Sequence, residues 1–215
     1  MKGFIRTAVI PVSLLTAALA VTEASGAILT LEHTTAYSGS VPSGPAPWLI
    51  ATFTDVGPDS VTLTLDASSL QGDEFVTLWA FNLHPALDPR KLTFSTPTKT
   101  GTFADPDVTR VADGVKAGSA HGFDFKLDFN PSKKHRFGAD EKATFTLGGI
   151  AGLSASSFDY SSASGSVRYK AGVHVQGLTD GGSGWVAPAV AAVPEPGTTA
   201  FVALAAGLVA ARRRR

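Results

Sequence analysis

The chain is expected to fold as an all-β protein, an antiparallel β-sandwich of which the jelly roll is one form. Apolar residues in its middle part recur with a period of two, which is typical of half-buried strands. Clusters of Gly, Pro and Asp separate these stretches, and the sequence before residue 198 shows no convincing amphipathic helix. Many short strands joined by such turns favour a sandwich over a helical or α/β fold.

The expected strands follow one another through a single domain at 28–190. They cover residues 28–31, 48–53, 61–65, 75–83, 92–94, 123–129, 144–147 and 167–175. The stretch 75–83 is apolar on both faces, which suits a central strand covered on each side. In 123–129, alternation predicts that Phe123, Phe125, Leu127 and Phe129 are buried while Asp124, Lys126 and Asp128 face water. The Ser-rich stretch 154–166 is expected to be an ordered loop or an irregular strand.

Composition excludes several classes of function. The chain has 215 residues and no cysteine, which removes disulfides, thiolate nucleophiles and Cys-based metal sites together. Its formal net charge is zero, but the two ends carry six of the cations and only two of the anions. Residues 28–190 therefore hold 12 basic and 16 acidic side chains. A mildly acidic domain without a basic patch argues against nucleic acid as a partner.

The N-terminal residues have the pattern of a secretory signal peptide. Lys2 and Arg6 form a positively charged start. An apolar stretch at 8–21 follows, and after it come the small residues at 24–27. Such a leader is removed after export. Cleavage by signal peptidase is expected after Ala27 or Gly26, with a cut after Ala20 as the alternative, so residues 1–27 form the leader and Sec-type machinery exports the chain.

The most specific pattern lies at residues 191–215. Pro194, Glu195 and Pro196 precede an apolar stretch at 198–211, and four arginines end the sequence: Arg212, Arg213, Arg214 and Arg215. Cations after an apolar segment act as a membrane stop and stay on the cytoplasmic side. The stretch has about fourteen residues against the roughly twenty that span a hydrocarbon core, so a transient membrane helix is expected.

The order of these three parts resembles the PEP-CTERM sorting domain of Gram-negative bacteria. The resemblance implies that exosortase, a membrane-embedded processing enzyme, acts near the Pro-Glu-Pro motif and discards the helix. It also implies a precursor at the inner membrane and a mature protein in the cell envelope or extracellular matrix. A tail-anchor helix after a Pro-rich linker is the alternative. The middle region, including 79–83 and 136–139, resembles an uncharacterised group of PEP-CTERM proteins that supplies no mechanism.

A search for catalytic or metal-binding patterns gives few candidates. Asp105, Asp107 and Asp113 are weak candidates for calcium ligands in a loop, although the EF-hand pattern is absent. Asp73, Glu74 and Asp88 could supply a glycosidase-like carboxylate pair, but Asp88 precedes a proline in a turn. The five histidines are scattered without zinc-site spacing. We therefore expect no enzyme activity and no cofactor.

Aromatic residues give the remaining functional hint. An exposed indole face can stack on the apolar face of a sugar ring. Trp48 and Trp185 lie near predicted loops and are the candidates for glycan contact, whereas Trp79 lies in the doubly apolar strand and is expected in the core. The resulting hypothesis is an exported structural or adhesive protein associated with exopolysaccharide. The alternatives are a carbohydrate-binding module and, third, a hydrolase whose site the sequence does not reveal.

Overall fold

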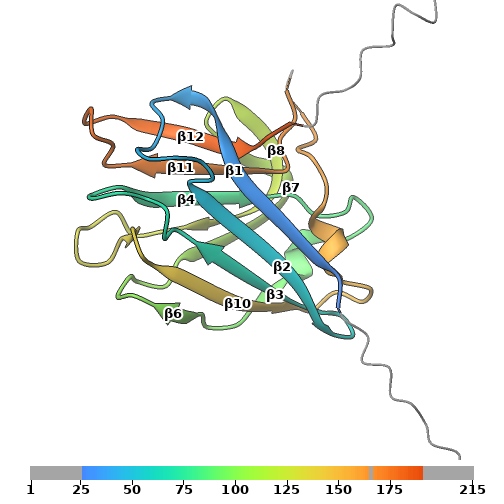
Figure 1. Cartoon of the computed structure of the whole chain (residues 1–215). Helices are drawn as coiled ribbons and strands as arrows, with labels where there is room; N and C mark the ends of the chain where they lie inside the picture. The colour runs from blue at the N-terminus through green and yellow to red at the C-terminus, as the bar shows by residue number, and fades with distance from the viewer. Residues whose placement is uncertain (1–25, 165–166, 191–215) are drawn as a thin grey trace, which may run out of the picture.

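The computed structural model describes residues 26–164 and 167–190 (Figure 1). Antiparallel strands make up about half of this part and are its main regular structure, which confirms the all-β prediction, and two short 3-10 helices lie between them. The strands are β1 (Ile28–Gly39), β2 (Leu49–Gly57), β3 (Ser60–Asp66), β4 (Phe75–Phe81), β5 (Thr93–Phe94), β6 (Thr98–Thr100), β7 (Asp107–Ala117), β8 (Ala120–Asp128), β9 (Phe137–Gly138), β10 (Lys142–Gly148), β11 (Ala171–Gln176) and β12 (Ser183–Pro188). The helices are η1 (Pro89–Lys91) and η2 (Ala155–Phe158).

The strands form one hydrogen-bonded sheet that curls back on itself. Its order is β5-β10-β3-β2-β1-β12-β11-β4-β8-β7, with β6 beside β10 and β9 beside β4. Phe53 of β2 and Phe81 of β4 are four strands apart in this order, about 19 Å in a flat sheet. Their ring centroids are nevertheless 5.4 Å apart. The two halves of the sheet therefore face each other, as the layers of a sandwich do.

Strand β1 makes the corner between the two halves. Its first part, from Ile28 to His33, pairs with β2, and its second part, from His33 to Gly39, pairs with β12. The register shifts twice along the second part, between His33 and Thr35 and between Ala36 and Ser38. Such irregularities let one strand bend from one layer into the other.

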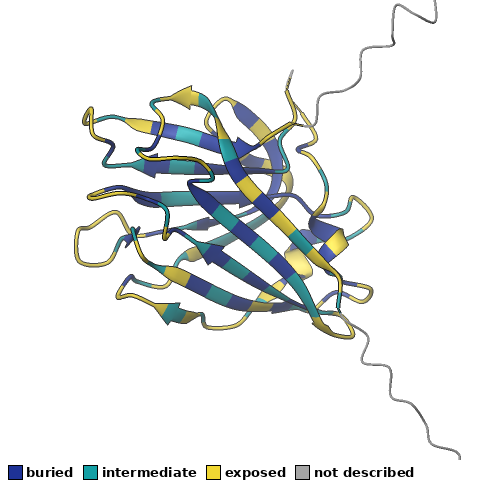
Figure 2. Ribbon diagram, in the orientation of Figure 1, coloured by how far each residue is buried: buried dark blue, intermediate teal, exposed yellow. Residues whose placement is uncertain are grey.

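The core lies between the facing halves. Buried and less buried residues alternate along β2, β3 and β10, as Figure 2 shows. The inward residues are mostly Phe, Leu and Val, and among the largest fully buried side chains are Trp79, Phe53, Phe81, Phe125, Phe137, Phe145 and Phe158. Burial of each such side chain contributes about 1.5–3 kcal/mol, which stabilises a domain that has no disulfide.

A second, smaller cluster lies on the opposite face of β4. Ala80 of β4, Val115 and Ala117 of β7, and Ala120 and Phe123 of β8 form its buried part. The hairpin of β7 and β8 bends over this face of the sheet, and register shifts in β7 between Arg110 and Lys116 accompany the bend. Strand β4 is thus covered on both faces, as its sequence predicts.

Some details of the strand predictions are wrong. The strand expected at 167–175 begins only at Ala171, and Val167 is exposed. Asp124 was expected to face water, but it is 8% exposed because the β7 bulge at Asp113 and the chain after β4 enclose it. Asp105, Asp107 and Asp113 were expected to share a loop, but Asp107 and Asp113 lie in β7.

The predicted signal peptide and the predicted sorting segment lie outside the described residues, except for the junction at Gly26 and Ala27. Within residues 26–164 and 167–190, no helix is long and apolar enough to cross a membrane.

Candidate functional site

An open depression of about 480 Å³ lies between the chain that follows β4 and the segment around η2. We call it the Tyr160 depression. The side chains that matter for its chemistry are His84, Leu87, Ser154, Ser156, Asp159 and Tyr160. Its volume is within the range of about 300–1,000 Å³ that is usual for small-molecule sites.

Hydrogen bonds hold the wall around η2 in place. The Asp55 carboxylate at the end of β2 accepts from the Ala155 amide at 2.6 Å, and the Asp59 carboxylate accepts from the Gly152 amide at 2.6 Å. The His84 amide donates to the Ser157 carbonyl oxygen at 2.7 Å, which joins the two sides of the depression. The Ser157 hydroxyl accepts from the Ser154 amide at 3.1 Å in a capping box. The site is therefore preformed.

Two aromatic rings meet edge to face in the depression. The centroids of His84 and Tyr160 are 4.6 Å apart, and their planes make an angle of 69°. The Ala86 amide donates to Nδ1 of His84 at 3.0 Å, so the proton of the neutral ring lies on Nε2. The histidine ring can thus donate one hydrogen bond from Nε2, while the tyrosine can use its ring and its hydroxyl.

Hydroxyl groups and one paired carboxylate complete the lining. The Ser154 and Ser156 hydroxyls lie 2.9 Å apart, and Ser156 is exposed. The Asp159 carboxylate forms an ion pair with Lys170. Asp159 is the one acidic residue of the lining. The arrangement suits a neutral ligand that offers hydroxyl groups and an apolar face.

Trp185, predicted near a loop, lies instead on strand β12 in the second cluster. His174 of β11 stacks on its indole with centroids 4.5 Å apart and planes at 18°. Tyr37 lies 6.4 Å away and itself stacks on Tyr169 at 4.5 Å. The β7–β8 turn approaches so closely that a Cβ on Gly118 would lie 2.9 Å from the indole. These neighbours already cover much of the ring.

Trp48, the other candidate for glycan contact, packs in the main core. Its side chain is 8% exposed, and Nε1 donates to the Gly44 carbonyl oxygen at 3.2 Å. Trp79 is fully buried, as its sequence context predicts. Trp48 therefore presents no exposed face on which a sugar ring would stack.

The calcium candidates are not gathered into a site. In the described part of the chain, no group of three or more His, Asp or Glu side chains is arranged to hold a metal ion. Asp105 pairs with Lys99, and Asp107 lies at the start of β7. Asp113 lies in the β7 bulge with a φ of 52°, where its amide donates to Asp124 at 2.9 Å.

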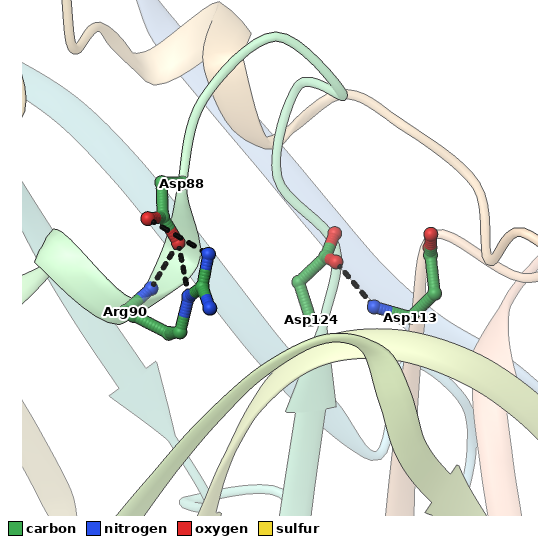
Figure 3. A network of polar contacts seen from close by, with 4 residues as sticks. All are labelled: Asp88, Arg90, Asp113 and Asp124. Carbon is green, nitrogen blue, oxygen red and sulfur yellow. Dashed lines mark hydrogen bonds and ion pairs between the residues drawn. The ribbon is translucent and has the colours of Figure 1, made fainter.

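Asp124 is one of the two buried carboxylates of the described residues (Figure 3). One oxygen accepts from the Asp113 amide, and the other accepts from the Leu83 amide at 2.8 Å. Burial raises the pKa of Asp124, while these two bonds act in the opposite direction. The residue therefore joins the β7 bulge to the chain that leads to His84.

The carboxylates considered for glycoside hydrolysis all have structural partners. Asp88 caps η1, and its bonds with Arg90 lower its pKa (Figure 3). Asp73 accepts from Arg136 at 2.6 Å, and this bond lowers its pKa. Glu74 is buried and accepts from the amides of Ser43 and Gln71 at 2.7 and 2.9 Å. Through these bonds, the three carboxylates stabilise turns of the chain.

Sequence reasoning missed the Tyr160 depression. His84 and Tyr160 are 76 positions apart in the sequence, and each stands in a stretch without any recognised motif. Only the Ser-rich composition around Tyr160, together with its two aromatic residues, marks this stretch as unusual. The curl of the sheet brings it beside the chain that follows β4, and periodicity does not predict that curl.

Comparison with known families gives one match. Residues 192–215 match the PEP-CTERM protein-sorting motif. The matched range includes Pro194, Glu195, Pro196 and the four terminal arginines, and it lies outside the described structure. No curated protein and no solved structure matches the chain. The motif marks an exported protein that passes through the membrane and is processed by exosortase.

Proposed function

We propose that this chain, which carries a PEP-CTERM protein-sorting motif, delivers a non-catalytic β domain to the cell envelope or extracellular matrix. There the domain has a structural or adhesive role associated with exopolysaccharide. The observation that supports this proposal most is the position of the motif directly after the fold. Strand β12 ends at Pro188, and the motif begins at residue 192.

Because this short connection lies after the last strand, the sorting motif can be removed without loss of any part of the fold. The six residue steps from Pro188 to Pro194 span at most about 22 Å. A cut near Glu195 therefore occurs close to the domain surface, yet it removes no strand. Strand β12 lies between β1 and β11 in the sheet, so both of its edges are paired. The released domain keeps its complete core.

The architecture also suits a durable component outside the cell. Aromatic pairs join the two halves of the sheet, including Phe53 with Phe81 at 5.4 Å and Phe94 with Phe125 at 5.7 Å. Such pairs contribute about 0.5–1.5 kcal/mol each beyond burial. Because cysteine is absent, stability does not depend on the redox state of the compartment.

Two alternatives make different predictions. A carbohydrate-binding module is favoured by the aromatic and hydroxyl lining of the Tyr160 depression and would bind glycan without consuming it. A hydrolase would need titratable groups that converge on one point of a pocket. The depression holds His84 and an Asp159 that is paired with Lys170, which favours binding over hydrolysis.

Localisation of the protein in a host that contains exosortase tests the proposal. The full-length chain would carry an epitope inserted after Gly57, at the exposed turn between β2 and β3. Immunoblots would compare cytoplasm, membranes, periplasm and extracellular matrix. The same fractions would be prepared from a strain that makes no exopolysaccharide, and purified matrix would be incubated with the mature protein to measure released reducing sugars.

We expect the mature protein in the matrix fraction of the wild-type strain and in the culture medium when exopolysaccharide is absent. Deletion of the gene should weaken cohesion of the matrix, and reducing sugars should not increase. Mature protein that stays in the periplasm, or that releases sugars from the matrix, would contradict the proposal.

A further inference from the structure

We infer that the Tyr160 depression is the glycan-contacting site of this domain and that it binds a neutral sugar segment, whereas Trp48 and Trp185 do not. The inference rests on the proposed role beside exopolysaccharide, because it names the site and the ligand class through which that role would act. The inference therefore assigns glycan recognition to His84 and Tyr160, and not to the tryptophans that the sequence singles out.

The first reason is the chemical character of the lining. A sugar unit offers an apolar C–H face and a rim of hydroxyl groups. The ring of Tyr160 supplies the surface for the apolar face. Hydrogen-bonding groups surround that ring: Nε2 of His84 and the hydroxyls of Ser154 and Ser156. The phenol hydroxyl of Tyr160 adds a group that both donates and accepts.

The second reason is charge. Asp159 pairs with Lys170 at the rim, so its negative charge is matched within the protein. The carboxylates behind the wall, Asp55 and Asp59, are engaged with the Ala155 and Gly152 amides. No unmatched cation lines the depression to attract uronate, phosphate or sulfate groups. This charge balance favours a neutral sugar over an acidic one.

The third reason is preorganisation. The bonds from Asp55, Asp59 and the His84 amide hold both sides of the depression in place before any ligand arrives. A rigid site loses less conformational entropy on binding, which compensates for the small contact area of a few sugar units. Because the depression is open, it can accept an internal segment of a chain as well as an end.

Trp48 and Trp185 are less accessible to a sugar ring than the Tyr160 depression is. The indole of Trp185 is stacked by His174 and lies close under the Gly118 turn, and Trp48 is 8% exposed. Either residue would need to leave its packing before a sugar ring could reach its face. The Tyr160 depression needs no such rearrangement.

Binding by the mature protein, purified from the matrix or culture medium of an exosortase-containing host, tests the inference. The probes are the neutral exopolysaccharide of that host, cellohexaose and laminarihexaose, with alginate hexamer as the acidic comparison. Isothermal titration calorimetry and affinity electrophoresis would measure binding. The variants are Tyr160→Ala, Tyr160→Phe and Ser156→Gln, the last of which places a longer side chain in the depression from an exposed position. The matched control is Trp185→Phe on the outer face.

We expect the wild type to bind at least one neutral probe and to bind alginate hexamer more weakly. Tyr160→Ala should weaken binding about two- to twelvefold, the value of an aromatic contact, while Tyr160→Phe should lose less. Ser156→Gln should also weaken binding, because its longer side chain occupies the depression. Trp185→Phe should bind like the wild type. Circular dichroism would establish that each variant is folded, and Ser156→Gln keeps the test valid should Tyr160→Ala fail to fold.

Three results would overturn the inference. They are absence of binding to all neutral probes, stronger binding to alginate, and loss of binding in Trp185→Phe with retention in Ser156→Gln. Failure of this inference and failure of the proposed function can be distinguished. A mature protein that is found in the matrix but does not bind these probes defeats only the site, whereas one that binds them and remains in the periplasm defeats only the matrix role.

Discussion

His33 and Trp79 meet in a T-shaped contact inside the core, with ring centroids 5.2 Å apart and planes at 87°. Both side chains are fully buried. His33 lies where β1 passes from pairing with β2 to pairing with β12, and its Nδ1–H donates to the Leu49 carbonyl oxygen at 3.2 Å. The contact joins the corner of the folded sheet to strand β4.

The burial of His33 predicts acid sensitivity. Desolvation lowers the pKa of His33 from 6.5 to about 3, so the folded protein holds the ring neutral. Its contribution to stability is complete above pH 6.5 and is lost as pH falls toward 3. For one proton the slope approaches about 1.4 kcal/mol per pH unit, or about 2 kcal/mol between pH 6.5 and pH 5. Urea unfolding across this range measures the loss.

The control for this effect is His33→Gln, which keeps an amide donor for the Leu49 carbonyl and removes the titration. The variant should be less stable than the wild type at pH 7.5, but its free energy of unfolding should fall less steeply below pH 6.5. Parallel pH profiles for the two proteins would show that His33 is not the source of the acid sensitivity.

Phe125 should be among the most sensitive core positions. Its ring is fully buried and lies 5.3 Å from Phe81 and 5.7 Å from Phe94, rings of two other strands. We expect Phe125→Ala to lower the free energy of unfolding by about 3–5 kcal/mol because it leaves a cavity between the halves. Chemical denaturation would measure this loss against Val111→Ala, a change at an exposed side chain that should cost less than about 0.5 kcal/mol. Equal losses would contradict the assigned core.

The prediction from sequence succeeded where strands alternate cleanly. The strands at 61–65 and 144–147 lie within β3 and β10, and their inward residues Leu63, Leu65 and Phe145 are buried as expected. An alternation with a period of two predicts burial correctly there because each of these strands has one core face and one outer face.

The same reasoning failed where the backbone is irregular. Strand β7 contains a bulge near Asp113 that breaks the alternation, so Asp107 and Asp113 were assigned to a loop. Strand β12 begins with Ser183 and Gly184 and resembled a turn, yet its glycine is required by the close approach of the Ser40 backbone. The Tyr160 depression depends on tertiary closure between distant segments, about which local patterns carry no information.

The close approach at Gly184 gives a further prediction. A Cβ at this position would lie 1.8 Å from the Ser40 carbonyl oxygen, so the backbones of β12 and the end of β1 would have to separate. We expect Gly184→Ala to cost about 1–3 kcal/mol, as overpacking does. Gly57→Ala is the matched control, since a Cβ there would meet no atom within 4 Å. A thermal unfolding midpoint for Gly184→Ala equal to that of Gly57→Ala would refute this packing.

The Pro-Glu-Pro motif should control processing. Pro194 and Pro196 restrict the backbone on both sides of Glu195 and cannot join a helix. We expect Glu195→Gln to slow processing, and Pro194→Ala with Pro196→Ala to leave an unprocessed, membrane-associated precursor in a host with exosortase. Immunoblots of membrane and extracellular fractions, with Thr199→Ala as control, would compare the masses. Wild-type processing in the double variant would exclude this role.

The terminal arginines should act at a different step. In the proposed route, removal of Arg212, Arg213, Arg214 and Arg215 would take away the cytoplasmic stop of a short apolar segment. We expect part of this variant to leave the membrane with its apolar tail still attached, which the motif variants should not do. Mass spectrometry of the extracellular fraction would detect the uncut tail, and its absence there would argue against a stop function.

Intact mass spectrometry of the protein in the matrix fraction, with and without the host's exosortase, is the most direct test of delivery to the matrix by the sorting motif. With exosortase, we predict a matrix protein whose mass matches a chain that begins at Ala27 or Ile28 and ends near Pro194–Pro196. Without exosortase, the protein should be found in the membrane fraction with residues up to Arg215 intact. A matrix protein of the same mass in both strains would contradict the proposed route.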